Sequence, residues 1–166
     1  DTSGAILALG NCTTVPDEAE QAAISEGVRW LLGLQNRDGG WPTFCRGWGQ
    51  LPFDRSCPDI TAHAIRALTA ASADPARRVA EATERGITYL AETQRADGAW
   101  TPLWFGNQWA PGHENPVLGT ARVLMALGSA RDERIRTMCE PGVEYLLGSQ
   151  HPDGGWGGGP DVRPTV

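Results

Sequence analysis

The chain has 166 residues, 40% of them hydrophobic, which is enough for one folded domain with a buried core. Its formal net charge is −6, and its 14 basic residues, all of them arginines, are scattered along the sequence. This distribution provides no basic surface for phosphate groups, so we expect no binding of nucleic acid. No segment approaches the roughly 20 consecutive apolar residues of a membrane-spanning helix, and the N-terminus has no secretory signal pattern.

Four cysteines are present without a secretory signal: Cys12, Cys45, Cys57 and Cys139. Proteins of the reducing cytoplasm keep such thiols free, whereas secreted domains pair them. We therefore expect free thiols and a cytoplasmic location. Cys45 and Cys57 bracket one loop, and they are the one pair whose spacing leaves a disulfide open as the alternative.

The first predicted helix opens at Thr2 and carries the pattern Thr-x-x-x-Ile/Leu-x-Ala-Leu, which occurs three times. Its threonines are 59 residues apart both times. Small, alanine-rich helices suit an inner layer in which backbones approach closely. The three copies are Thr2/Ile6/Ala8/Leu9, Thr61/Ile65/Ala67/Leu68 and Thr120/Leu124/Ala126/Leu127.

A longer, charged helix follows each of these and suits an outer layer. In the first copy, apolar residues at the 3.6-residue period predict a helix over residues 17–35, with Asp17 as its N-cap. Asp74 and Pro75 are expected to cap and start the second outer helix. Pro141 predicts a break in the third near Glu140, because proline removes a helical hydrogen bond.

Each outer helix ends in the turn Gln-x-x-Asp-Gly-x-Trp. The Asp-Gly pair in each turn predicts a chain reversal, because glycine takes positive φ at no steric cost. The glutamines are 59 and 56 residues apart, and this regular period predicts an array of helical hairpins. We expect an all-α fold of about three hairpins forming one partial domain over residues 1–166. The turns run from Gln35 to Trp41, from Gln94 to Trp100 and from Gln150 to Trp156.

The loops from a turn to the next inner helix are long and rich in aromatic residues. Such loops on one side of a helical array are typical of a binding face. Rings that only cover helix ends would produce the same composition, so both interpretations stay open. The rings in question are Phe44, Trp48, Phe53, Trp104, Phe105 and Trp109.

These repeats resemble the class II triterpene cyclases, the squalene-hopene and oxidosqualene cyclases. The resemblance covers essentially the whole chain and implies an α/α toroid whose outer helices are tied together by the glutamine and tryptophan of each turn. Protein prenyltransferase β subunits share a related toroid. The landmarks that favour the cyclases are Gly39-Gly40-Trp41-Pro42-Thr43-Phe44, Leu51-Pro52-Phe53 and Pro58-Asp59-Ile60-Thr61-Ala62-His63.

The resemblance implies acid-initiated cyclisation of a linear, squalene-like polyprenoid by an isomerase that uses neither metal nor cofactor. Asp1-Thr2 is similar to the end of the family's Asp-x-Asp-Asp-Thr acid motif, and the aspartate that protonates the alkene would lie upstream of Asp1. The 166 residues alone are therefore expected to be inactive. By resemblance, His63 orients and acidifies the acid, although a hydrogen bond to Asp59 is the ordinary role of such a histidine.

The resemblance also implies which residues line the substrate cavity and what the parent enzyme contacts. Phe44, Phe53 and Trp104 would line the cavity, because aromatic faces stabilise carbocations without reacting with them. After Trp104 the sequence departs from the squalene-hopene pattern, which leaves the product open. The parent enzyme is expected on one leaflet of the inner membrane, and an open arc of hairpins is expected to self-associate through its apolar face.

Two alternatives stay open. A toroid like that of the prenyltransferase β subunit would need a zinc site, for which Cys57, Asp59 and His63 offer the only cluster of suitable residue types. A non-catalytic helical scaffold would instead bind a partner on its concave face.

Overall fold

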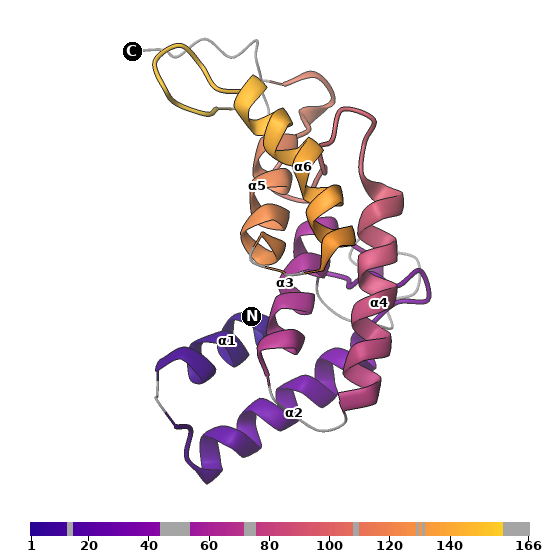
Figure 1. Cartoon of the computed structure of the whole chain (residues 1–166), viewed down its shortest axis with the longest axis vertical. Helices are drawn as coiled ribbons and strands as arrows, with labels where there is room; N and C mark the ends of the chain where they lie inside the picture. Colours follow the sequence, from indigo (N-terminus) through magenta and orange to yellow (C-terminus); the bar gives the residue numbers. More distant parts are fainter. Residues whose placement is uncertain are drawn as a thin grey trace. The chain divides into compact units, whose positions relative to one another are not determined.

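The computed structural model describes residues 1–12, 15–43, 54–71, 76–107, 110–128, 130 and 132–157. These ranges hold six α-helices and one short 3-10 helix, η2 (Pro111–His113), but no β-strand (Figure 1). The expected all-α class is confirmed. The α-helices are α1 (Thr2–Cys12), α2 (Glu18–Leu34), α3 (Pro58–Ala70), α4 (Ala76–Thr93), α5 (Pro116–Leu127) and α6 (Glu133–Gly148).

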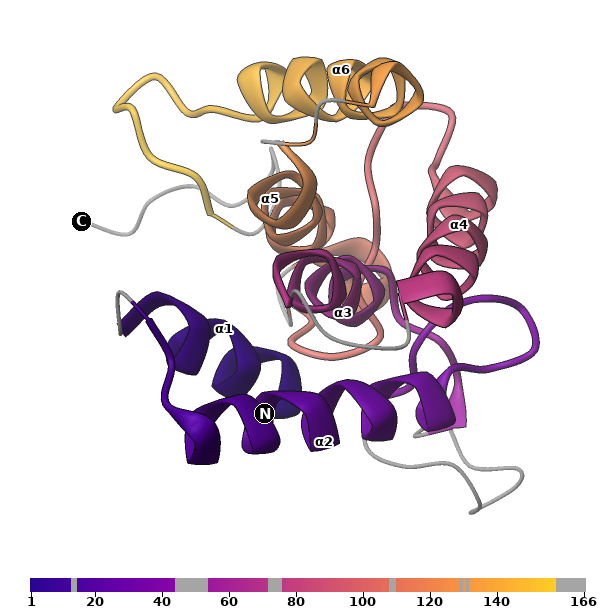
Figure 2. The ribbon, with the colours of Figure 1, turned by 60° about the horizontal axis from the view of Figure 1, so that its bottom comes forward.

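The chain forms two compact units, residues 1–90 and 91–166. In the first unit, α1 packs against both α2 and α3, and Figure 2 shows α1 lying along α2. In the second unit, α5 packs against α6. Short alanine-rich helices and longer charged helices therefore alternate as the repeats predict, whereas the single domain over residues 1–166 stays a prediction.

The start of α2 follows from its sequence. The Asp17 carboxylate accepts a hydrogen bond from Glu20 N at 2.9 Å, and Asp17 N donates to Glu20 Oε2 at 2.8 Å. This reciprocal capping box satisfies two backbone donors that a helix start otherwise leaves unpaired. The predicted N-cap is thus confirmed. The corresponding prediction for Asp74 and Pro75 lies outside the described residues.

The predicted break at Pro141 is wrong, because α6 runs without interruption from Glu133 to Gly148. The turn that precedes α5 packs tightly against this point: a Cβ on Gly98 would lie 2.4 Å from the carbonyl oxygen of Pro141. Tertiary packing of this kind can outweigh the hydrogen bond that an interior proline removes.

The three turns adopt the predicted backbone. Their central glycines have φ of 90° at Gly39, 85° at Gly98 and 90° at Gly154. The side-chain amide of each turn glutamine donates to the carbonyl oxygen of its glycine at 2.8–2.9 Å. A local hydrogen bond and a left-handed glycine therefore shape all three reversals in the same way.

The first two turns are also anchored to the next outer helix. The amide of Gln35 donates to Ala82 O of α4 at 2.8 Å, and its carbonyl oxygen accepts from the Arg85 guanidinium. The amide of Gln94 donates to Met138 O of α6 at 2.9 Å. Each of these glutamines thereby bonds its turn to a later outer helix, and both partners of each bond lie in the same unit.

The recurring threonines hold the turn tryptophans in place. Thr61 Oγ1 accepts from Trp41 N, and Thr120 Oγ1 accepts from Trp100 N, both at 2.9 Å. Both threonines are completely buried, and the two tryptophans are 1% and 0% exposed. Because a buried backbone N–H needs an acceptor, Thr61 and Thr120 mark the points at which the first two turns enter the core.

The recurring outer-helix glycine provides room for this packing. A Cβ on Gly86 would come within 2.9 Å of both Ile65 and the Trp41 ring, and one on Gly142 would come within 2.9 Å of the Trp100 ring. The tryptophan of one turn thus lies against the glycine of the next outer helix, a contact that any larger residue would obstruct.

We expect Thr61→Val to lower the free energy of unfolding by about 1–3 kcal/mol, because it leaves Trp41 N buried without an acceptor. Urea denaturation followed by circular dichroism measures this change. Thr88→Val on α4 is the matched control, since Thr88 is exposed and bonds only to its own helix in the described structure. Equal losses in the two variants would contradict the role assigned to Thr61.

We expect Gly86→Ala to destabilise the chain by about 1–3 kcal/mol, because the new methyl group overlaps Ile65 and Trp41. Gly33→Ala on α2 should instead stabilise it by up to about 1 kcal/mol, because no atom lies within 4 Å of the added Cβ and alanine favours a helix. Thermal denaturation of both variants tests the pair. A neutral Gly86→Ala would show that this contact is not tight.

Candidate functional site

A pocket of about 320 Å³ lies in the first unit at the head of α1. Its polar side chains come from the start of α1, the middle of α3 and Thr43 after the first turn, and its apolar wall comes from α2, Trp41 and Pro42. Two predicted site residues, Asp1 and His63, therefore line one cavity. The remaining lining residues are Thr2, Ser3, Trp30, Leu31, Leu34, Trp41, Pro42, Thr43, Ile60 and Ala64.

His63 is held beside the first turn of α1. A Cβ built on Gly4 would lie 4.0 Å from the Cε1 atom of the His63 ring, so the ring packs where α1 has no side chain. Both His63 and Asp1 are exposed in the structure. The packing of α1 against α3 thus brings together two residues that lie 62 positions apart in the sequence.

A buried thiol–carboxylate pair lies at the start of α3. The Cys57 thiol donates to Asp59 Oδ1 at 2.7 Å, and the residues are 1% and 5% exposed. A carboxylate buried to this degree needs such donors. Asp59 lies one helical turn before His63, so the pair supports the segment that carries the histidine.

A second set of hydrogen bonds holds Ser56, just before α3, against the first turn. The Ser56 hydroxyl donates to Asp38 Oδ1 at 2.7 Å, and the Tyr89 hydroxyl donates to Ser56 O at 2.8 Å. Burial raises the pKa of Tyr89 well above its usual value, and the acidic groups of Asp38, Cys57 and Asp59 raise it further. Tyr89 therefore stays a neutral hydrogen-bond donor.

The structure describes only part of the predicted aromatic wall. Phe44 and Phe53 lie outside the described residues, as do Trp48 and Trp109. Trp104 belongs to the second unit and is partly exposed. The assignment of Phe44, Phe53 and Trp104 to the cavity wall stays a prediction.

The loop after Trp104 has an unusual backbone. Phe105 and His113 have φ of 63° and 59°, in a region that side chains other than glycine rarely enter. Asn115 Nδ2 donates to Phe105 O at 3.2 Å, and the Arg122 guanidinium lies 5.2 Å from the centre of the Phe105 ring. Glu114 forms an ion pair with Arg95 at 3.0 Å, so it is part of the loop structure.

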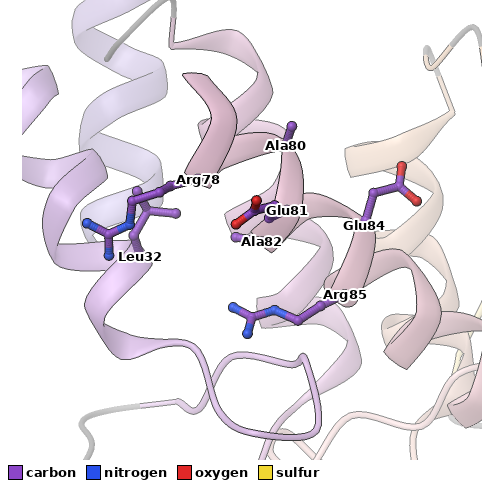
Figure 3. A pocket seen from close by; sticks show the side chains of 7 residues that line it. All are labelled: Leu32, Arg78, Ala80, Glu81, Ala82, Glu84 and Arg85. Atoms are coloured by element: carbon purple, nitrogen blue, oxygen red, sulfur yellow. The ribbon is translucent and has the colours of Figure 1, made fainter. Parts of the chain in front are cut away.

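A larger cleft of about 580 Å³ separates the outer helices α2 and α4 (Figure 3). Its floor contains Leu32 and Ala82, and its charged side chains come from the exposed face of α4. One of these, Glu81, has a side chain that is 59% exposed, and it forms an ion pair with Arg77 at 2.8 Å. The cleft is therefore a seam between helices, and the smaller pocket at α1 is the better candidate for chemistry.

Neither a metal site nor a membrane span is found in the part of the chain that the structure describes. No three His, Cys, Asp or Glu side chains there gather closely enough to hold a metal ion, and Cys57, Asp59 and His63 form no such cluster. No described helix combines the length and apolar character needed to cross a bilayer.

Comparison with known proteins yields matches over nearly the whole chain. A sequence model of the squalene-hopene cyclase C-terminal domain matches residues 1–162. A probable squalene-hopene cyclase of Sinorhizobium fredii is 32% identical over 170 residues, which cover 95% of this chain and 25% of that protein. The drimenyl diphosphate synthase of Streptomyces showdoensis is 33% identical over 148 residues, 88% of this chain and 25% of that protein.

A third relative, the squalene-hopene cyclase of Alicyclobacillus acidocaldarius, is 28% identical over 225 residues, 94% of this chain and 34% of that protein. The chain thus spans between a quarter and about a third of the length of these relatives.

Sequence reasoning missed the supporting residues of the site. It treated Asp59 as an alternative partner of His63 and, with Cys57, as a candidate zinc ligand, but it predicted neither the Cys57–Asp59 hydrogen bond nor any role for Tyr89. The run Cys57-Pro58-Asp59 at a helix start was the available signal, because proline at the first helical position places the next side chain in the first turn.

The three described cysteines are free thiols, which agrees with the expectation of unpaired thiols. We expect iodoacetamide at pH 8 to alkylate exposed Cys12 about tenfold or more faster than buried Cys57 and Cys139. Burial also raises the pKa of Cys139, which further lowers its reactive thiolate fraction. Peptide mass spectrometry over time measures each rate. Equal labelling of Cys12 and Cys57 in the folded chain would contradict the burial of Cys57.

Proposed function

Because the chain belongs to the family of squalene-hopene cyclase C-terminal domains, we propose that it is the part of a terpene cyclase that supports the initiating acid. The observation that supports this proposal is the pocket at the head of α1, which Asp1 and His63 line together. The α/α toroid is the fold of this family, in agreement with the all-helical hairpins described above.

The proposed reaction starts with protonation of an alkene. An alkene is a very weak base, so the acid must be held protonated and aligned in a site with little water. In this proposal Asp1 is the last carboxylate of the acid motif and an aspartate upstream of it transfers the proton. His63 donates a hydrogen bond to the acid group, which fixes its orientation and balances the charge left after proton transfer.

The walls of the pocket suit a hydrocarbon. Leu31 and Leu34 of α2 and Pro42 after the turn present no nucleophile to a cation, and among the lining residues that the structure describes only Asp1 and His63 are titratable. The titratable groups thus come from the head of α1 and from α3, and the aliphatic lining comes from α2 and Pro42. This is the arrangement that an acid-initiated cyclisation needs, because cations formed after the first step must not be captured.

The substrate proposed first is a linear triterpene such as squalene. The drimenyl diphosphate synthase among the relatives makes a prenyl diphosphate the second candidate. Because a free hydrocarbon substrate partitions into bilayers, we also propose that the full-length protein contacts one leaflet peripherally. Flotation of the full-length protein with phospholipid vesicles tests this contact, and a protein that stays in the dense fraction would contradict it.

The direct test is to incubate the full-length protein with squalene, its epoxide and a linear prenyl diphosphate, and to analyse the products. We expect His63→Ala to lower the cyclisation rate by about 10²–10⁴-fold, the range typical of an assisting acid–base group. His151→Ala is the matched control, since His151 lies in the third turn, where its ring bonds to Gly157 O.

Two outcomes would contradict different parts of the proposal. If His63→Ala cyclises at the unaltered rate while the folded protein is active, the role of His63 is wrong. If the unaltered protein makes no cyclic product from any of the three substrates, cyclisation itself is wrong.

A further inference from the structure

The start of α3 differs from the starts of three other helices. The N-cap side chains of α2, α5 and α6, which are Asp17, Asn115 and Asp132, each accept a hydrogen bond from a backbone N–H of their helix. Cys57 occupies the N-cap of α3 and makes no such bond in the described structure. Its thiol donates to Asp59 Oδ1 instead. Because serine, threonine, aspartate and asparagine are the residues that stabilise an N-cap, Cys57 does not serve the helix start in the usual way.

The next inner helix shows that the fold does not need a buried carboxylate at this point. In the register of the 59-residue repeat, the counterparts of Cys57 and Asp59 are Pro116 and Leu118 of α5. This helix packs against α6 with a leucine at the position where α3 carries the carboxylate. Asp59 is only 5% exposed, and burying a carboxylate costs free energy that burying an apolar residue does not. The thiol–carboxylate pair therefore serves something other than the repeat.

The pair lies one helical turn from the histidine of the candidate site. His63 follows Asp59 by four residues, and residues at this spacing lie on the same side of a helix. His63 also lines the pocket with Asp1. Its counterpart on α5 is Arg122, so the thiol, the carboxylate and the imidazole are all replaced in the next copy. The three residues thus occur together in the copy that carries the pocket.

The backbone holds the thiol in one position. Cys57 N donates to Trp41 O at 3.0 Å, and Cys57 O accepts from Thr61 N at 2.9 Å. Cys57 is 1% exposed, so packed atoms enclose its side chain. The preceding residue, Ser56, is fixed by a hydrogen bond from the Tyr89 hydroxyl to its carbonyl oxygen. A thiol held in this way fixes the position of the carboxylate to which it donates.

We propose that Cys57 is a positioning residue for the initiating acid. Its thiol holds the Asp59 carboxylate, and this carboxylate orients the His63 imidazole toward the acid group at the head of α1. Cys57 is not among the described residues that line the pocket, so it acts through Asp59 and not on the substrate. This inference rests on the proposed function, because it extends the support of the acid from His63 to a buried residue behind it.

Steady-state kinetics of the full-length protein with squalene, its epoxide and a linear prenyl diphosphate test this role. We expect Cys57→Ala to lower kcat by about 10- to 100-fold with little change in KM, because a displaced assisting group affects the chemical step more than substrate binding. Cys57→Ser keeps a donor for Asp59 and should restore kcat to within about threefold of the unaltered value. Packing alone would not separate the two variants, because serine and alanine are both smaller than cysteine.

Chemical labelling of His63 tests the same role without catalysis. We expect diethyl pyrocarbonate to modify His63 about threefold or more faster in Cys57→Ala than in the unaltered protein, because an imidazole that a carboxylate holds less firmly has a more accessible ring nitrogen. Cys57→Ser should leave the rate unchanged. Peptide mass spectrometry measures the rate, with His151 of the third turn as the internal reference.

Cys139→Ala is the matched control. Cys139 is also a free and buried thiol, at 7% exposure, but it lies on α6 of the second unit. No carboxylate accepts a hydrogen bond from its sulfur in the described part of the chain. This variant should keep both kcat and the labelling rate of His63, although it too loses a buried sulfur atom.

Asp59→Leu tests whether Cys57 acts through the carboxylate. Leucine is the residue at the corresponding position of α5, so a helix start of this kind is compatible with it. Once Asp59 is replaced, we expect Cys57→Ala to cause no further loss of kcat and no further rise in labelling, because the thiol then has no acceptor. Additive effects of the two substitutions would contradict the assigned route.

Two results would overturn the proposal. One is a folded Cys57→Ala variant that matches the unaltered protein both in kcat and in labelling of His63. The other is a Cys57→Ser variant as impaired as Cys57→Ala, which would show that Cys57 only fills space.

The remaining outcomes are also decisive. If circular dichroism shows that Cys57→Ala does not fold, Asp59→Leu alone gives the same comparison, because it leaves the thiol without its acceptor. If the unaltered protein makes no cyclic product from any of the three substrates, the proposed function fails, and the labelling rates of His63 then decide the role of Cys57 by themselves.

Discussion

The contact between a turn tryptophan and the glycine of the next outer helix is the constraint on which the rest of the structure depends. It places a large ring where any side chain on the helix would overlap it, and it is accompanied by two buried hydrogen bonds, from the turn glutamine and to the inner-helix threonine. Hydrophobic burial gives this contact its strength, and the hydrogen bonds give it a single register.

This contact also positions the candidate site. The first turn leads through Ser56 into α3, and the bonds from Ser56 to Asp38 and from Tyr89 to Ser56 fix where that helix begins. His63 lies on α3 against Gly4 of α1, and Asp1 lies at the start of α1. A turn with no chemical role of its own therefore helps to determine the geometry of a histidine and a carboxylate at the pocket.

A repeat built in this way has two unlike faces. Each hairpin offers a turn to its successor and an outer helix to its predecessor, so stability depends on neighbours as it does in other repeat proteins. The half-exposed Trp156 and the buried Trp41 show how much apolar surface one such contact removes from water.

The sequence by itself determined the features that local signals encode. Asp17 and Glu20 specify the start of α2, the glycine of each turn specifies a left-handed residue, and the period specifies hairpins. Only the tertiary structure decided that α6 continues through Pro141, that Thr61 and Thr120 bind the turn backbones, and that Asp1 shares a pocket with His63. These outcomes rest on contacts between residues 20 or more positions apart, where packing and the pairing of buried polar groups outweigh local propensity.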